Sequence, residues 1–240
     1  EGKVACVTGA SNGLGQEVAS TLVENGARVI GIARNKNLLE SWSQKTGCNA
    51  AYITSDLTDR NNIKKITTQI SEFFGPPDIL INAAGVNTRE HADDVTFNNW
   101  DKTIELNLAA PFFIAQALVP NMKRKGWGRI VNFASLQSRR AFPSGLSYGA
   151  SKGGVEQMTR AMAEAWSSEG ITVNAIAPGF FPTNLTAAVF NNPKLSKKNA
   201  EQTCIGRNGK LEDLSGPILF LCSKASNYVT GQMLFVDGGF

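Results

Sequence analysis

The sequence has few of the residues that usually bind metals or form disulfides. Its 240 residues include one histidine, His91, and four cysteines, Cys6, Cys48, Cys204 and Cys222. No two cysteines form a C-x-x-C pair, and most of them lie in apolar segments, so the spacing predicts neither a zinc site nor a disulfide framework. We expect reduced thiols, as in a reducing compartment, and no bound metal. His91 is interpreted as a solvated loop residue.

Long hydrophobic runs and concentrated charge are also missing. No apolar run approaches the ~20 residues that cross a bilayer, and residues 1–4 have neither the n-region nor the h-region of a leader. The formal net charge of +4 is spread along the chain, with basic runs only at 123–125 and 197–198. Such short runs are typical of solvated helix ends rather than of a nucleic-acid surface. We therefore expect a cytoplasmic protein that binds neither membranes nor nucleic acids.

Short apolar, β-branched runs alternate with longer helical patterns from end to end, without an internal repeat or a linker. With 42% hydrophobic and 18% charged residues, this pattern predicts one globular domain over residues 1–240. The strand candidates are too continuously apolar for a sheet with one wet face. We therefore expect an α/β fold, a doubly wound parallel sheet with helices on both faces and ligands at the carboxyl ends of its strands. Strands are predicted at 4–8, 28–33, 50–54, 79–82, 129–135, 172–177 and 233–236, and helices at 14–25, 59–74, 100–125, 148–168 and 211–223.

A glycine-rich loop follows the first predicted strand and opens the first predicted helix. The run from Thr8 to Gly15, T-G-A-S-N-G-L-G, has the spacing G-x-x-x-G-x-G. In this context glycines allow a tight turn and a close backbone approach to the pyrophosphate of a dinucleotide at a helix N-terminus. The alternative is a turn that binds no ligand. Three glycines cost conformational entropy on folding, and a plain turn would not require them. The residues expected to contact the pyrophosphate are Gly9, Ser11, Asn12, Gly13, Leu14 and Gly15.

The end of the second predicted strand favours a phosphorylated cofactor. An acidic residue about 20 residues beyond the loop would hold the adenosine ribose, but the sequence there is Ile32-Ala33-Arg34-Asn35. The planar guanidinium of Arg34 can pair with a 2′-phosphate, so we predict NADP(H) as the preferred cofactor, with NAD(H) possible. The alternative is a solvated arginine after a strand. Further cofactor contacts are expected from Asp56 and Leu57 at the adenine and from the small-residue floor Asn82, Ala83, Ala84 and Gly85.

A phenol, an ammonium and a hydroxyl are spaced as a proton-transfer device in the second half of the chain. Lys152 follows Tyr148 by four residues, which places both side chains on one face of a helix, and Ser135 precedes Tyr148 by thirteen. The ammonium would lower the phenol pKa from about 10 toward neutrality. Taken alone, a tyrosine and a lysine at this spacing also describe many surface pairs.

With the glycine loop, the floor, Asn107, Ser135, Tyr148, Lys152 and Pro178-Gly179 all in order, the chain resembles the short-chain dehydrogenase/reductase family over essentially its whole length. The resemblance implies a Rossmann-type sheet of about seven strands, a nicotinamide cofactor and interconversion of a secondary alcohol and a ketone. It also implies a homotetramer. Ala83 departs from the second asparagine that many members carry, which puts one side-chain bond in doubt.

The same resemblance assigns roles to a catalytic tetrad of Asn107, Ser135, Tyr148 and Lys152. Ser135 would hold the substrate oxygen and Tyr148 would give or take its proton. Lys152 would also hold the nicotinamide ribose, and Asn107 would anchor a water that links the lysine to solvent. The cofactor contacts then include, besides the loop and floor, Tyr148, Lys152, Pro178, Gly179 and Thr183.

Within the family the chain most resembles the members that act on sugar acids, the gluconate 5-dehydrogenases and the 2-deoxygluconate or 2-dehydro-3-deoxygluconate dehydrogenases. Arg89 and Gln137 carry most of that likeness. A small polyhydroxy acid needs a cation for its carboxylate and several hydrogen-bonding groups for its hydroxyls. The predicted substrate-binding residues are Arg89, Ser135, Gln137, Arg140 and Asn184, with Asn87 as a further hydrogen-bonding group.

Two other functions remain open from the sequence. A 3-oxoacyl-[acyl-carrier-protein] reductase would use the same tetrad, with Lys123, Arg124, Arg139 and Arg140 docking an acidic carrier. A catalytically silent nucleotide sensor or scaffold would have no chemical need for the intact tetrad. Residues 180–205, called here the covering segment, are polar and broken by Asn191-Asn192-Pro193, and they are expected to lie over the cleft and to close on substrate.

Overall fold

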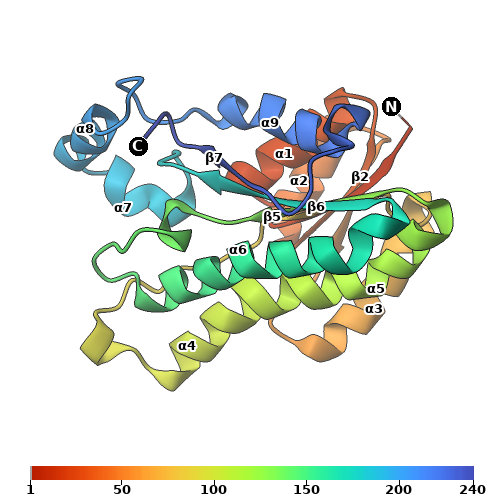
Figure 1. The fold of residues 1–240 in the computed structure, drawn as a ribbon, viewed down its shortest axis with the longest axis horizontal. Coiled ribbons are helices and arrows are strands. Elements are labelled where there is room, and N and C mark those ends of the chain that lie inside the picture. Colours follow the sequence, from red (N-terminus) through yellow and green to blue (C-terminus); the bar gives the residue numbers. More distant parts are fainter. Residues whose placement is uncertain (1) are drawn as a thin grey trace.

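All the strands lie in one parallel sheet. The computed structural model describes residues 2–240, and its seven strands are ordered β3-β2-β1-β4-β5-β6-β7 (Figure 1). Every neighbouring pair in this order runs parallel, as the alternation of strands and helices predicted. The strands are β1 (Val4–Thr8), β2 (Arg28–Ala33), β3 (Ala50–Thr54), β4 (Ile79–Asn82), β5 (Gly128–Phe133), β6 (Ile171–Pro178) and β7 (Met233–Val236).

Helices cover both faces of the sheet (Figure 1). The apolar side chains of α1, α2 and α9 pack against one face, and those of α3, α5 and α6 pack against the other. The expected doubly wound Rossmann-type α/β fold is thereby confirmed. The helices are α1 (Gly13–Glu24), α2 (Lys36–Thr46), α3 (Arg60–Phe74), α4 (Phe97–Ile104), α5 (Ala110–Lys125), α6 (Leu146–Trp166), α7 (Ala187–Phe190), α8 (Pro193–Glu201) and α9 (Ser215–Cys222).

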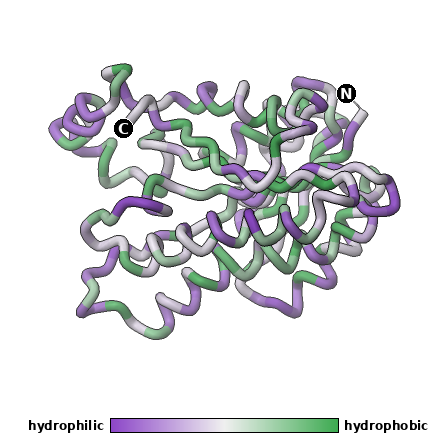
Figure 2. The backbone as a smooth tube through the Cα atoms, viewed as in Figure 1, coloured by the Kyte–Doolittle hydropathy of each residue, from purple (hydrophilic) through white to green (hydrophobic). Residues whose placement is uncertain are grey.

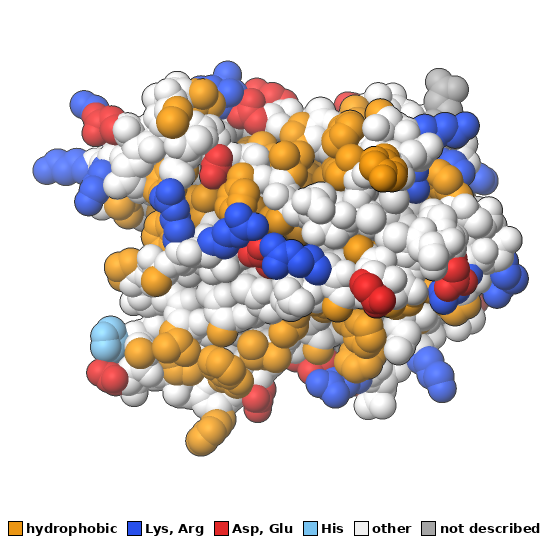
Figure 3. Space-filling view, viewed as in Figure 1, with side chains coloured by type: hydrophobic (Ala, Val, Ile, Leu, Met, Phe, Trp, Pro, Cys, Tyr) orange, Lys and Arg blue, Asp and Glu red, His pale blue; other side chains and the backbone are white. Residues whose placement is uncertain are grey.

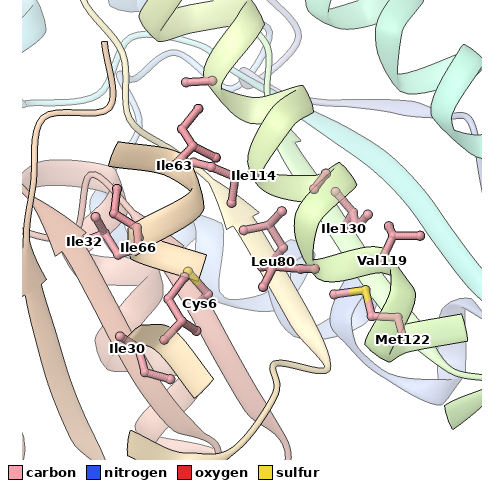
Figure 4. Close-up of a cluster of buried hydrophobic side chains, with 14 of the residues drawn as sticks. Cys6, Ile30, Ile32, Ile63, Ile66, Leu80, Ile114, Val119, Met122 and Ile130 are labelled. Carbon is pink, nitrogen blue, oxygen red and sulfur yellow. The ribbon is translucent and has the colours of Figure 1, made fainter. Parts of the chain in front are cut away.

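Burial follows the strand pattern seen in the sequence. Every residue of β1, β4, β5 and β6 is buried, because these central strands are covered on both sides. Figure 2 shows the outer coils alternating between hydrophilic and hydrophobic residues as each amphipathic helix turns. Figure 4 shows one core cluster, in which Ile66 of α3, Ile114 of α5 and Met122 of α5 meet Leu80 and Ile130 of the sheet.

The predicted helix 100–125 is longer and less regular than expected. It begins at Phe97, where the Thr96 side chain accepts a hydrogen bond from Asn99 N, and it includes a π-helical turn at Glu105–Ala109. Such turns are frequent at functional sites, and this one contains Asn107. The fifth strand is also shorter than the predicted 129–135, because Ser135 Oγ accepts a bond from Gln137 N and starts a tight turn.

One helical stretch of the described residues, Phe97–Lys125, is long and apolar enough to cross a membrane. Half of its most apolar window is buried inside the protein. Ile114, Leu118 and Met122 on this stretch are fully buried against the sheet. The stretch is therefore a core helix of the fold.

Candidate active site

A cavity of about 710 Å³ opens at the carboxyl ends of the strands. Its wall is built from the loops that follow β1, β2, β3, β4, β5 and β6, together with the start of α6 and the covering segment. This edge of the sheet is where a doubly wound fold binds its ligands. The residues predicted to contact the cofactor that line the cavity are Gly9, Ser11, Asn12, Gly13, Leu14, Gly15, Arg34, Asp56, Leu57, Ala83, Ala84, Gly85, Tyr148, Lys152, Pro178, Gly179 and Thr183.

Asn82 is the member of that predicted set that the structure does not bring to the cavity. Its side-chain amide is buried and donates to Asn132 Oδ1 at 2.9 Å and to Pro111 O at 3.3 Å. Those bonds tie β4 to β5 and to the start of α5. The amide therefore supports the sheet beneath the floor.

The glycine loop has the geometry of a phosphate cradle. Gly9 has φ of 75°, and a Cβ on it would lie 2.9 Å from Ala84 Cα, so the loop and the floor are in backbone contact. A Cβ on Gly15 would overlap the Gly9 carbonyl, so α1 starts directly against the loop. The N-cap side chain of Asn12 makes no bond to the first turn of α1, and that turn carries no acidic residue. Its N–H groups suit a pyrophosphate.

The floor is held by one side chain of β1. Thr8 Oγ1 accepts hydrogen bonds from Ala83 N and Ala84 N, both at 3.1 Å. The small side chains then leave the backbone open to the cavity. Ala83 thus keeps its backbone position in the wall although it lacks the amide that many family members have there.

The far end of the cavity has the charge pattern expected for the adenosine half of a cofactor. Arg34 is exposed directly after β2 and lines the cavity beside Asp56. Burial would raise the pKa of Asp56, but hydrogen bonds from Thr58 N and Thr58 Oγ1 and the charge of Arg34 lower it overall. Asp56 is therefore an ionised acceptor at neutral pH, and Arg34 offers an uncommitted cation.

Ser135, Tyr148 and Lys152 meet in the middle of the cavity. Tyr148 and Lys152 are buried on the same face of α6, and Lys152 Nζ lies 5.6 Å from the centre of the Tyr148 ring. Lys152 Nζ donates to Phe133 O at 2.5 Å, while Ser138 Oγ donates to Lys152 O at 2.7 Å. These bonds attach α6 to the end of β5 and to the turn that follows it. The prediction that both side chains share one helix face is confirmed.

The expected lowering of the Tyr148 pKa by Lys152 is not what the structure shows. Burial raises the pKa of the Tyr148 phenol overall, while the nearby Ser135 hydroxyl and the charge of Arg89 oppose the rise. Lys152 is itself buried, which lowers its pKa to about 8, and its Nζ is held against the Phe133 carbonyl. The phenol is therefore protonated at neutral pH and can act as a proton donor.

Asn107 braces the site from outside the cavity wall. Its Oδ1 accepts from Val86 N at 2.8 Å, and its Nδ2 donates to Val86 O at 2.9 Å and to Ser151 Oγ at 3.0 Å. The buried amide therefore joins the loop after β4 to α6, one residue away from Lys152. The predicted bridging water at Asn107 stays a prediction.

Some of the residues predicted to bind the substrate line the cavity. Arg89, Asn87, Gln137 and Ser135 line it. Arg89 has φ of 55°, which is costly for a residue with a Cβ, and its guanidinium donates to Leu185 O of the covering segment at 2.7 Å. The Gln137 Oε1 atom is buried and has no hydrogen-bond partner among the described residues.

Arg140 and Asn184 are not among the residues that line the cavity. The Arg140 guanidinium lies 5.3 Å from the centre of the Phe240 ring, outside the cavity wall. Asn184 is exposed at the first turn of the covering segment. Of the two arginines predicted to bind substrate, Arg89 lines the cavity and acts on Tyr148 through its charge.

Sequence reasoning missed an apolar part of this wall. Phe142, from the loop between Ser135 and Tyr148, lines the cavity, and so does Phe180 after β6. Phe142 lies in the sequence between Ser135 and Tyr148, and this position could have indicated that it lines the cavity. The covering segment adds further apolar side chains to the wall, and these are Leu185, Val189 and Leu195.

The fold and this site define an NAD(P)-dependent oxidoreductase that acts on an alcohol or a carbonyl group. A phosphate cradle, a floor for a flat ring and a proton donor line one cavity. The family model described as enoyl-(acyl carrier protein) reductase matches residues 9–240. The chain belongs to the short-chain dehydrogenase/reductase family.

Curated relatives match the chain over nearly its full length. Gluconate 5-dehydrogenase of Gluconobacter oxydans is 37% identical over 99% of this chain and 94% of its own length. The 2-dehydro-3-deoxy-D-gluconate 5-dehydrogenase of Escherichia coli is 39% identical over 100% of this chain and 96% of its own. A 3-oxoacyl-[acyl-carrier-protein] reductase of Salmonella typhimurium is 34% identical over 100% of this chain and 97% of its own.

A solved relative has the same fold. The gluconate 5-dehydrogenase of Burkholderia cenocepacia, in complex with NADP and tartrate, superimposes with a TM-score of 0.93 at 33% identity. The match covers 100% of this chain and 95% of that chain. The predicted family resemblance is confirmed.

Proposed function

We propose that the protein is an NADP(H)-dependent dehydrogenase that interconverts a secondary alcohol and a ketone of a sugar acid, such as gluconate or a deoxy-ketogluconate. One observation carries this proposal. Ser135, Tyr148 and Lys152 share a single cavity with the glycine loop at one end and with Arg89 beside them. A reacting hydroxyl, a nicotinamide and a carboxylate then each have a suitable group in the same space.

Four residues of the cavity and its support would have separate roles in the reaction. Ser135 Oγ would hold the substrate oxygen, and the protonated Tyr148 phenol would donate its proton to that oxygen during reduction. Lys152 would hold the nicotinamide ribose, and Asn107 would keep the loop after β4 against α6. When bound, the cofactor supplies or accepts the hydride.

The cavity fits the phosphorylated cofactor. At Gly9 and Gly15 the loop has no room for a side chain, which suits a phosphate. Arg34 lines the cavity directly after β2 and would pair with the 2′-phosphate of NADP(H). The solved relative from Burkholderia cenocepacia is a complex with NADP, which supports this choice. Tartrate in that complex is a hydroxy acid, so it also supports an acidic substrate for the present chain.

The proposed activity can be tested by absorbance at 340 nm. Purified protein with NADPH is offered a panel of keto sugar acids, acetoacetyl thioesters and neutral ketones. We expect oxidation of NADPH to be fastest with a keto sugar acid. Turnover of the thioesters with none of the sugar acids would overturn the sugar-acid assignment.

Arg89 provides a sharper test of the substrate class. Replacing Arg89 with methionine should raise KM for an acidic substrate about 10- to 100-fold, because a charge-assisted hydrogen bond is worth roughly 1.5–3 kcal/mol. The KM for a neutral ketone should change less than threefold. Kinetics of both substrates in parallel give the ratio, and Arg28→Met, on the amino end of β2, is the matched control. An unchanged ratio would remove Arg89 as the carboxylate partner.

The apolar wall keeps a second candidate function open. Phe142, Phe180, Leu185, Val189 and Leu195 suit an acyl chain, and a 3-oxoacyl-[acyl-carrier-protein] reductase is among the relatives. Each of the basic residues proposed for docking an acidic carrier also has a contact within the chain. Figure 3 shows Lys and Arg side chains across the middle of one face. The partners in the contacts within the chain are Glu169 for Lys123, Asn121 for Arg124, Glu156 for Arg139 and the Phe240 ring for Arg140.

Other sequence predictions stay predictions. These are the homotetramer, the cytoplasmic location and the closing of the covering segment on substrate. The closing is supported by Leu185, Val189, Leu195 and Asn199 of that segment, which line the cavity. Proteolysis of the segment with and without NADPH would test its closing.

A further inference from the structure

Three phenylalanine rings from distant parts of the chain meet beside the substrate end of the cavity. The Phe142 and Phe180 ring centres are 6.1 Å apart and the rings are nearly perpendicular. The Phe240 ring lies 5.3 Å from Phe180 and 6.2 Å from Phe142. All these separations are in the range at which aromatic pairs attract one another.

The three rings have different relations to the cavity. Phe142 and Phe180 line it, alongside Ser135 and Tyr148. Phe240 does not line it but contacts both of the other rings, and the Arg140 guanidinium lies 5.3 Å from its ring centre. A substitution of Phe240 therefore changes the support of the wall without removing a lining atom.

The tail after β7 is tied to the end of the covering segment. Ile205 N donates to Gly238 O at 3.2 Å, and Cys204 Sγ lies 3.2 Å from Gly239 O as a hydrogen-bond donor. Gly238 and Gly239 have φ of 71° and 77°, and a Cβ on either would lie within 3.0 Å of Ile205 or Cys204. The path of the tail is therefore set by close packing against residues 203–205, which follow α8 in Figure 1.

We propose that Phe240 positions Phe142 and Phe180 as an aromatic wall that packs against the carbon chain of the substrate, and so sets substrate affinity from outside the cavity. The two apolar rings suit the carbon backbone of the substrate, while Arg89 and Gln137, which line the same cavity, would meet its polar groups. This inference rests on the proposed function only in requiring that a carbonyl substrate occupies the cavity.

The test compares Phe240→Ala with Phe240→Tyr, which keeps the ring, and with Phe220→Ala, a half-exposed phenylalanine on α9 outside the cavity. KM and kcat are measured with whichever carbonyl substrate the wild type reduces, and the Kd of NADPH is measured by fluorescence. Phe240→Ala should raise KM roughly tenfold, with kcat and the NADPH Kd within twofold of wild type. Phe240→Tyr and Phe220→Ala should keep the wild-type KM. An unchanged KM in Phe240→Ala, or a parallel loss of NADPH affinity, would overturn the proposal.

A second measurement does not depend on the substrate. Hydrogen exchange of the loop 139–145 should be faster in Phe240→Ala than in wild type or in Phe220→Ala, because the Phe142 ring loses a partner. Unchanged exchange in this loop would contradict the positioning role even if no substrate is found. Failure of the sugar-acid panel alone would count against the proposed function and leave this comparison intact.

Discussion

Replacement of Tyr148 by phenylalanine should lower kcat about 1,000-fold, within the range that a positioned acid or base contributes. The change removes one oxygen from a buried side chain whose pKa is raised and which faces Ser135 in the cavity. The ring remains, so packing of α6 should be preserved. Reduction of the substrate by NADPH, followed at 340 nm, gives kcat for both proteins.

The controls for Tyr148→Phe separate chemistry from folding. The Kd of NADPH should stay within about threefold of wild type, because the glycine loop and Arg34 are untouched. Tyr228→Phe removes the same atom from a fully exposed tyrosine and should be silent. Activity of Tyr148→Phe within tenfold of wild type would show that another group transfers the proton.

Arg34→Asp should reverse the cofactor preference. Loss of a charge-assisted bond to the 2′-phosphate and the added repulsion should lower kcat/KM for NADPH by about 100-fold. The new carboxylate can accept hydrogen bonds from the ribose hydroxyls of NADH, as acidic residues do at this position in other dinucleotide sites, so kcat/KM for NADH should rise. Steady-state kinetics with both cofactors measure the ratio.

The matched control for Arg34→Asp lies on the same strand. Arg28 is exposed at the start of β2, at the edge of the sheet opposite the cavity, and Arg28→Asp makes the same change in net charge. Its preference for NADPH should equal that of wild type. If Arg34→Asp also leaves the ratio unchanged, or if wild type prefers NADH, Arg34 does not select the cofactor.

Local sequence pattern predicted the frame of the site well. Each of the strands β1, β4 and β6, and the loop from Gly9 to Gly15, shows its pattern within a few consecutive residues. The structure of each therefore follows from residues that are neighbours in the sequence. Tyr148 and Lys152 are one helical turn apart, and their shared face needs only helix geometry. Because all the strands are parallel, their carboxyl ends lie at the same edge of the sheet, where the cavity is.

What could not be predicted depends on contacts between distant residues. The wall of Phe142, Phe180 and Phe240 joins three loops, and no local pattern pairs them. Arg140 was expected at the substrate, but it does not line the cavity, and its guanidinium lies 5.3 Å from the centre of the Phe240 ring. The Tyr148 pKa is set by burial more than by its neighbour four residues along, and burial is a property of the whole fold.

The central claim is that this cavity passes a hydride between a bound cofactor and a carbonyl carbon. NADPH carrying deuterium at nicotinamide C4 on the transferred face, incubated with a keto acid that the wild type reduces, tests this most directly by mass spectrometry of the product. We predict one deuterium on the former carbonyl carbon with wild type and almost no product with Tyr148→Phe. Product without deuterium, or labelled product formed equally fast by the variant, would contradict the account.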